Sequence, residues 1–182
     1  VFVKRVVEAG VGQVQVTGTC FEYGMQSGPL GEALECRPAN AYGLAKHSLR
    51  LFLETLSRQL PFHLQWARLF YLYGEGQNPN SLLAALDRAI DSGQASFDMS
   101  AGEQLRDFLP IETATDHLAG LLQRRDFSGV VNVCSGQPVS VRNLVERHCA
   151  ARHSAIALNL GHYPYPAHEP LAFWGDARRL YA

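Results

Sequence analysis

The feature that most constrains the fold is a regular alternation of strand-like and helix-like segments along most of the chain. In "QVQVTGT", Val14 and Val16 alternate with polar residues as in a strand, and "HLQWARLFYLYG", "QASFDM", "LRDFLPI" and "GVVNVC" read as further strands. Between these runs, apolar residues recur at helical spacing over about 40–60, 81–92, 112–125 and 140–152. Strands and helices that alternate at this pace predict an α/β fold with a largely parallel sheet.

Glycine, proline and asparagine residues set the expected ends of these elements. The first residues read as the end of a helix, which Gly10 and Gly12 terminate. Residues 24–38 are rich in Gly and Pro and should form a loop. Asn40 can cap the helix that follows, and Pro61 closes that helix after about Leu60.

Charge, hydropathy and cysteine spacing narrow the class of protein. The 182 residues include 16 Lys+Arg and 17 Asp+Glu without a basic block, so no nucleic-acid partner is expected. No apolar run approaches the roughly 20 residues of a membrane span, and "VFVKRVVEAG" does not resemble a signal peptide. The four cysteines form no C-x-x-C pair, which favours free thiols in a reducing compartment. These features predict a cytoplasmic protein with one core and small-molecule or protein partners.

The stretch "NAYGLAK" places Tyr42 and Lys46 four residues apart near the start of a predicted helix. Side chains at this spacing share one helical face, about 5–6 Å apart at Cβ. A phenol titrates near 10 in water, and a nearby ammonium stabilises its phenolate form by Coulomb attraction, so the two residues could form an acid–base pair. The pair could equally lie on a solvated helix face, and the spacing alone does not distinguish the two interpretations.

Further motifs surround this pair in a fixed order: "VQVTGT" and "TCFEYG" precede it, and "ARLFYLYGEGQ", "EQLRDFLPIETATDHL", "NVCSGQPVSVRNLVE" and "AFWGDARRL" follow it. With these spacings the chain resembles the nucleotide-sugar epimerase/dehydratase branch of the extended short-chain dehydrogenase/reductase family. The resemblance covers nearly the whole chain but only the family's second half, because the opening strand and its G-x-x-G-x-x-G turn have no counterpart here.

This resemblance implies the fold in more detail. The expected architecture is the C-terminal part of a Rossmann-like doubly wound parallel sheet plus a smaller α/β substrate-binding lobe, without the N-terminal glycine-rich half. Residues 1–75 should belong to the dinucleotide-binding domain with the catalytic helix. Residues 76–182 should form mainly the lobe, with 106–134 returning in part to the sheet.

The resemblance also implies catalytic roles. Tyr42 matches the tyrosine that exchanges a proton with a sugar hydroxyl while a sugar carbon exchanges hydride with the nicotinamide of NAD or NADP. Lys46 matches the lysine that holds the nicotinamide ribose and supports the tyrosine, so both residues are expected to contact the cofactor. Thr19 falls where a serine or threonine hydrogen-bonds the reacting oxygen.

The two residues after Thr19 bear on the type of reaction. Family members that eliminate water carry an Asp-Glu pair there, whereas this chain has Cys20 and Phe21. The departure favours a 4-epimerase or a 4-keto reductase over a 4,6-dehydratase, with Cys20 and Phe21 beside the substrate. Glu22 comes one residue later, and strand alternation predicts that it points to the other face.

The resemblance implies a nucleotide-sugar substrate whose base and sugar stay open. Arg106 matches an arginine that binds the nucleotide diphosphate, where a planar fork of donors fits phosphate oxygens. Tyr71 stands where the family usually has an asparagine that helps hold the substrate. An arginine usual before the terminal motif is missing, and Pro166 and His168 stand nearby.

Family members form homodimers by pairing the Tyr/Lys helix and its neighbour. A homodimer through this helix is therefore expected, with Leu49, Leu53 and Leu56 exposed on it. No metal site is expected, because Cys149 and His153 have a suitable i,i+4 spacing but lack a third ligand.

Val1 already lies inside an amphipathic pattern, which predicts that these residues are part of a longer polypeptide of about 300 residues. Alone, they should show neither NAD(P) binding nor turnover, because the main anchor of the pyrophosphate is missing. The alternative interpretation is a non-catalytic remnant that binds a sugar nucleotide without a cofactor.

Overall fold

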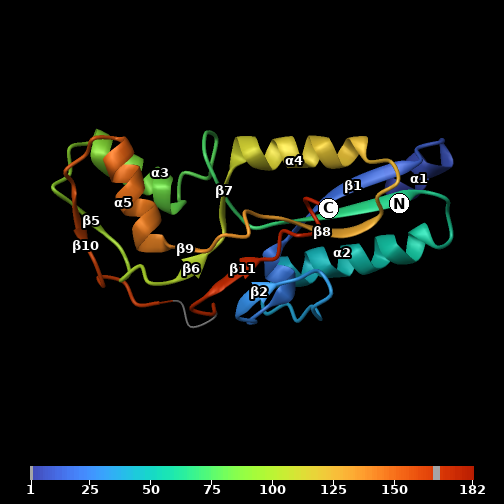
Figure 1. Cartoon of the computed structure of the whole chain (residues 1–182), viewed down its shortest axis with the longest axis horizontal. Coiled ribbons are helices and arrows are strands. Elements are labelled where there is room, and N and C mark those ends of the chain that lie inside the picture. The colour runs from blue at the N-terminus through green and yellow to red at the C-terminus, as the bar shows by residue number, and fades with distance from the viewer. Residues whose placement is uncertain (1, 166–168) are drawn as a thin grey trace.

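A computed structural model describes residues 2–165 and 169–182, and its centre is a three-stranded parallel sheet (Figure 1). The strand order is β1–β3–β8, formed by Gln13–Thr19, His63–Leu69 and Gly129–Val133. β1 pairs with β3 along its whole length, and β3 pairs with β8. The predicted α/β fold with a parallel sheet is confirmed, and the carboxyl ends of the three strands share one edge.

Helices cover both faces of this sheet (Figure 1). On one face, α1 (Phe2–Glu8) and α2 (Ala41–Ser57) pack against Leu64 and Trp66 of β3. On the other face, α4 (Ile111–Gln123) packs against Ala67. Each face of the sheet therefore has its own apolar core.

The position of α2 corrects one expectation about its apolar residues. Leu53 is 1% exposed and Leu56 is 8% exposed, because both contact the sheet, whereas Leu49 is 41% exposed. The prediction that all three are exposed was wrong, since helical periodicity does not show which side of a helix meets a sheet.

A second group of elements lies at the opposite end of the molecule (Figure 1). It contains α3 (Leu82–Asp91), α5 (Val141–Ala151) and the parallel pair of β5 (Ser96–Asp98) and β10 (Ala157–Asn159). Its buried core is formed by Leu83, Leu86, Met99, Val145 and Cys149. The division into domains at residue 75 stays a prediction.

Three short strand pairs join the two ends. β4 (Tyr71–Tyr73) pairs with β7 (Phe108–Pro110), β2 (Gly28–Leu30) pairs with β11 (Phe173–Gly175), and β6 (Leu105–Arg106) pairs with β9 (Val139–Ser140). The first two pairs are parallel and the third is antiparallel.

Two segments expected to be continuous strands are interrupted. "HLQWARLFYLYG" divides into β3 and β4 at Phe70, and "LRDFLPI" divides into β6 and β7 at Asp107. Phe70 N still donates to Val133 O of the central sheet, whereas Tyr71 N donates to Asp107 O. The chain thus changes its pairing partner within one residue, which apolar alternation does not reveal.

The start of α2 agrees closely with the expectation from sequence. The Asn40 side chain accepts a hydrogen bond from Gly43 N at 2.8 Å, so the predicted cap is confirmed. The helix ends at Ser57, three residues earlier than Leu60. Tyr42 therefore lies in the first turn and Lys46 one turn later.

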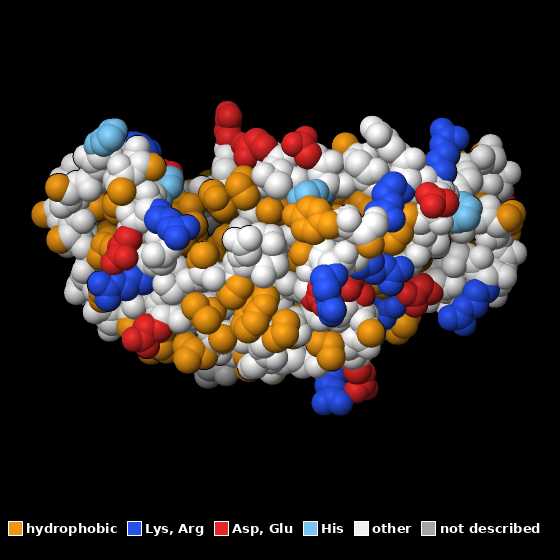
Figure 2. Space-filling model, viewed as in Figure 1, with side chains coloured by type: hydrophobic (Ala, Val, Ile, Leu, Met, Phe, Trp, Pro, Cys, Tyr) orange, Lys and Arg blue, Asp and Glu red, His pale blue; other side chains and the backbone are white. Residues whose placement is uncertain are grey.

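The surface carries charges of both signs, and apolar side chains gather near the middle of the face in Figure 2. Within the described residues, no helix has the length and apolar character that crossing a bilayer requires.

Candidate active site

The carboxyl end of β1 forms one corner of the candidate site. After Thr19 the chain enters a 3-10 turn, η1 (Cys20–Tyr23), and the Thr19 hydroxyl oxygen accepts a hydrogen bond from Phe21 N at 3.3 Å. The Glu22 carboxylate in turn accepts one from Thr19 N at 2.9 Å. The assumption of strand alternation for Glu22 was wrong, because this residue lies in a 3-10 turn. In this turn the Thr19 and Glu22 side chains form a capping box, in which each accepts a hydrogen bond from the backbone.

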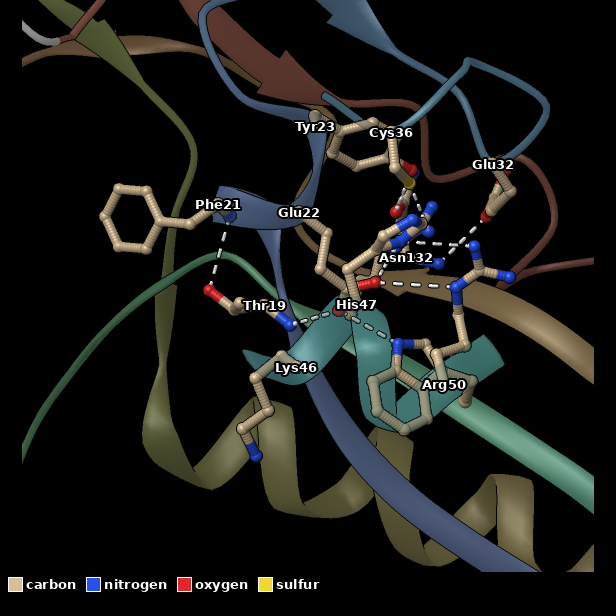
Figure 3. A network of polar contacts seen from close by, with 12 residues as sticks. Thr19, Phe21, Glu22, Tyr23, Glu32, Cys36, Lys46, His47, Arg50 and Asn132 are labelled. Carbon is tan, nitrogen blue, oxygen red and sulfur yellow. Dashed lines mark hydrogen bonds and ion pairs between the residues drawn. The ribbon is translucent and has the colours of Figure 1, made fainter. Parts of the chain in front are cut away.

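The Tyr42 and Lys46 side chains contact the two elements at this corner, η1 and β1. Lys46 Nζ donates to Thr17 O of β1 at 2.9 Å, so α2 places its ammonium beside the strand that ends at Thr19 (Figure 3). The Tyr42 ring is 55% exposed and contacts the Phe21 ring edge-on, with 6.4 Å between ring centroids. The roles of Thr19, Tyr42 and Lys46 in catalysis stay predictions.

A buried charged network holds this corner together (Figure 3). Glu22 is fully buried, and one carboxylate oxygen accepts a hydrogen bond from Trp66 Nε1 at 2.9 Å. The other oxygen lies 3.1 Å from Arg68 Nε and 3.6 Å from Arg50 Nε. One carboxylate thus links η1, β3 and α2, a structural role that the sequence patterns did not indicate.

The same network contains a group of possible metal ligands. Glu22, Cys36 and His47 bring one carboxylate oxygen, one thiol and one imidazole nitrogen within 4.8 Å of one another. However, the Arg50 and Arg68 guanidinium groups already compensate the carboxylate charge, and Arg68 Nη2 donates to Cys36 Sγ at 2.8 Å. Burial and the nearby Arg50 cation lower the pKa of His47. Two cations so close oppose a divalent ion, and we assign no metal here.

Aromatic rings extend from Tyr42 toward the middle of the molecule. The Phe21 ring contacts the Tyr71 ring with 6.1 Å between centroids, and Tyr71 contacts Phe173 at 6.0 Å. Cys20 is 4% exposed beneath this row, and burial raises the pKa of its thiol to about 12. Phe21 and Tyr71 are half-buried, while the expected contact of Cys20 with substrate stays a prediction.

Arg106 and Tyr71 line a pocket of about 290 Å³ at the end of this row, together with Gln104, Phe108, Glu169 and the first residues of α3. Arg106 is 3% exposed, and its Nη2 donates to Glu169 Oε2 at 2.9 Å. Its Nη1 donates to Leu105 O and Leu171 O, which fixes the guanidinium group in the pocket wall. No sequence pattern indicated Glu169, which is 63 residues from Arg106. Pro166 and His168 lie outside the described residues.

Asp107, next to Arg106, has a different environment. It is fully buried and accepts hydrogen bonds from the backbone N–H groups of Ser135, Gly136 and Gly175. It therefore holds the loop after β8 against β11 and does not face the pocket.

Comparison with known proteins shows which family the chain matches. Residues 2–134 match the sequence profile of the NAD dependent epimerase/dehydratase family. The dTDP-6-deoxy-L-talose 4-dehydrogenase (NAD(+)) of Aggregatibacter actinomycetemcomitans is 31% identical over 175 residues, which are 96% of this chain and 64% of that protein. The GDP-6-deoxy-D-mannose reductase of Pseudomonas aeruginosa is 31% identical over 127 residues, which are 65% of this chain and 40% of that protein.

A solved structure supports the same relationship. MoeE5 in complex with UDP-glucuronic acid and NAD has a TM-score of 0.83 and 28% sequence identity, and the match covers 97% of this chain and 60% of MoeE5. The chain thus spans less than two thirds of these proteins. The resemblance inferred from the motifs is confirmed: this chain belongs to the NAD dependent epimerase/dehydratase family.

Proposed function

We propose that this chain carries the proton-transfer residues and the sugar-nucleotide pocket of an NAD(P)-dependent enzyme that oxidises or reduces C4 of a nucleotide-linked 6-deoxyhexose. The observation that carries the proposal is the contact of Lys46 Nζ with β1 beside Thr19, which places the Tyr/Lys helix against the strand end. The curated relatives support the substrate class, because both are named for 6-deoxy sugars and one for a 4-dehydrogenase.

The hydrogen bonds within the chain leave donors on Thr19 and Lys46 available to a substrate and a cofactor. The Thr19 hydroxyl oxygen accepts from Phe21 N, so its hydrogen remains available to a substrate oxygen. Lys46 uses one N–H for Thr17 O and keeps two for a ribose. The exposed Tyr42 phenol can pass a proton to or from the sugar hydroxyl.

The nicotinamide cofactor, when bound, accepts or supplies the hydride. The residues of this chain fit the ribose end of such a cofactor, since the two free N–H groups of Lys46 lie beside the carboxyl end of a parallel strand.

Replacing Tyr42 tests the catalytic part of the proposal. In the longest reading frame that contains these residues, Tyr42→Phe should abolish turnover and leave NADH binding intact, because only the acidic hydroxyl is lost. Tyr163→Phe is the matched control, since Tyr163 is 54% exposed and takes part in none of the contacts described above for Thr19, Tyr42 and Lys46. Retained turnover in Tyr42→Phe would remove the tyrosine from the mechanism.

The pocket at Arg106 is the proposed site of the nucleotide diphosphate. Calorimetry with UDP-, dTDP-, CDP- and GDP-sugars should show a loss of about 1.5–3 kcal/mol in Arg106→Ala, the usual contribution of a hydrogen bond to a charged group. Arg178→Ala changes an exposed arginine and should leave binding unchanged. Unchanged affinity in Arg106→Ala, with the fold verified by circular dichroism, would place the diphosphate elsewhere.

We also propose that the protein forms a homodimer through the exposed side of α2. Leu44, Leu49, Leu51 and Phe52 are 41–56% exposed on this helix, an unusual set of apolar side chains for a solvated surface. Sedimentation of the longest reading frame should show a dimer, and Phe52→Asp should convert it to a monomer. A Phe52→Asp protein that remains dimeric would exclude this helix as the interface.

A further inference from the structure

Phe21 lies between the two ends of the proposed substrate site. Its ring centroid is 6.4 Å from that of Tyr42 and 6.1 Å from that of Tyr71. On the far side of Tyr71, the Arg106 guanidinium carbon is 6.0 Å from the Tyr71 centroid. The Phe21 ring points away from the Glu22 network (Figure 3). A sugar that reaches from a diphosphate at Arg106 to a proton donor at Tyr42 must therefore pass beside Phe21.

The geometry of a hexose limits which part of the sugar can face this ring. In a pyranose, C1 carries the diphosphate and C4 lies opposite to it across the ring. Two edges connect these atoms: the C2–C3 edge with two hydroxyl groups, and the C5–O5 edge, which carries C6. Phe21 has no hydrogen-bonding side-chain atom, and a buried hydroxyl without a partner is unfavourable. The edge that contacts Phe21 is therefore the one with C6.

The groups around Phe21 also favour a particular substituent at C6. Its own backbone N–H is bonded to the Thr19 hydroxyl, and the Cys20 thiol next to it is buried. The Arg106 cation is paired with Glu169, which also accepts from the Tyr71 hydroxyl at 3.4 Å. A hydroxymethyl group at C6 would bury its hydroxyl against a phenyl ring. A methyl group does not have this disadvantage.

We propose that Phe21 is a specificity-determining residue that selects a C6 methyl group over a C6 hydroxymethyl group. The proposal rests on the proposed function and adds the side chain that makes the distinction. Aromatic rings fit this role because they bury a large apolar area with few rotatable bonds.

The test compares two substrates that differ only at C6. With the longest reading frame and its nicotinamide cofactor, kcat/KM should be roughly 10- to 100-fold higher for a dTDP-6-deoxyhexose than for the matching dTDP-hexose, the range typical of an apolar site that meets one added hydroxyl. Phe21→Gln, which offers a donor and an acceptor, should reduce this ratio to about threefold or less. Phe21→Leu is the matched control and should keep the preference, because it stays apolar.

Binding provides a second readout that does not depend on turnover. In the Tyr42→Phe background, calorimetry with the same two sugars should show the same preference and its loss in Phe21→Gln. If the wild-type protein acts on neither sugar at C4, whether UDP, dTDP, CDP or GDP carries it, the proposed function fails. If it acts on both sugars equally, or if Phe21→Gln keeps the preference, the role of Phe21 is refuted while the proposed function stands.

Discussion

The substitution Glu22→Gln examines the buried network with the smallest possible change. The amide has nearly the same size as the carboxylate and keeps one acceptor oxygen. It loses the negative charge, however, and its NH2 group faces either the donors on Trp66 and the backbone of Thr19 or the Arg68 guanidinium, depending on which oxygen it replaces. The perturbation is therefore mainly electrostatic.

The expected loss follows from the burial of the partners. Removing one member of a buried ion pair costs about 3–5 kcal/mol, because the remaining charge is left uncompensated. Arg68 is 1% exposed and would keep only Cys36 Sγ and the face of the Tyr23 ring, 4.5 Å from its guanidinium carbon. Arg50 is 12% exposed and would keep Glu54 as a partner. Since only one of the two arginines is left unpaired, we expect about 3 kcal/mol, the low end of that range.

Urea unfolding of the longest reading frame, followed by circular dichroism, measures this loss. Glu146→Gln makes the same chemical change in an exposed i,i+4 pair with Arg142, and it should cost no more than about 0.5 kcal/mol. A loss below about 1 kcal/mol in Glu22→Gln would refute the reasoning, because it would mean that the guanidinium groups do not depend on this carboxylate for their burial.

Three further predictions concern the elements that surround the site. A Cβ at Gly18 would clash with Trp66 Nε1, so Gly18→Ala should cost about 1–3 kcal/mol in urea unfolding, and a neutral effect would show that the indole can move. Asn40→Ala should cost about 1 kcal/mol by loss of the α2 cap, whereas Ser81→Ala at the start of α3 should cost little because Ser81 makes no capping bond; equal losses would contradict this. Because the pKa of His47 is lowered in the fold, the unfolded chain binds the proton more tightly, so stability should decrease as pH falls below about 6.5, and His47→Gln should remove that part of the pH dependence; an unchanged profile would argue against it.

Local patterns in the sequence determined the class of fold and the position of the candidate catalytic helix. Strand and helix periods depend only on residues a few positions apart, and so do the Asn40 cap and the i,i+4 spacing of Tyr42 and Lys46. These interactions form within one element, so they can be read without knowing which elements meet. The order of motifs then supplied the family, which the comparisons confirmed.

The tertiary structure alone decided the contacts between distant segments. Glu22 pairs with Arg68 at a separation of 46 residues, and Arg106 pairs with Glu169 at a separation of 63. Periodicity does not specify such partners, because it shows that a side is apolar without showing which element will cover it. Leu53 was misjudged for the same reason: its burial depends on the sheet that α2 covers, and no residue within the helix determines which of its sides meets that sheet.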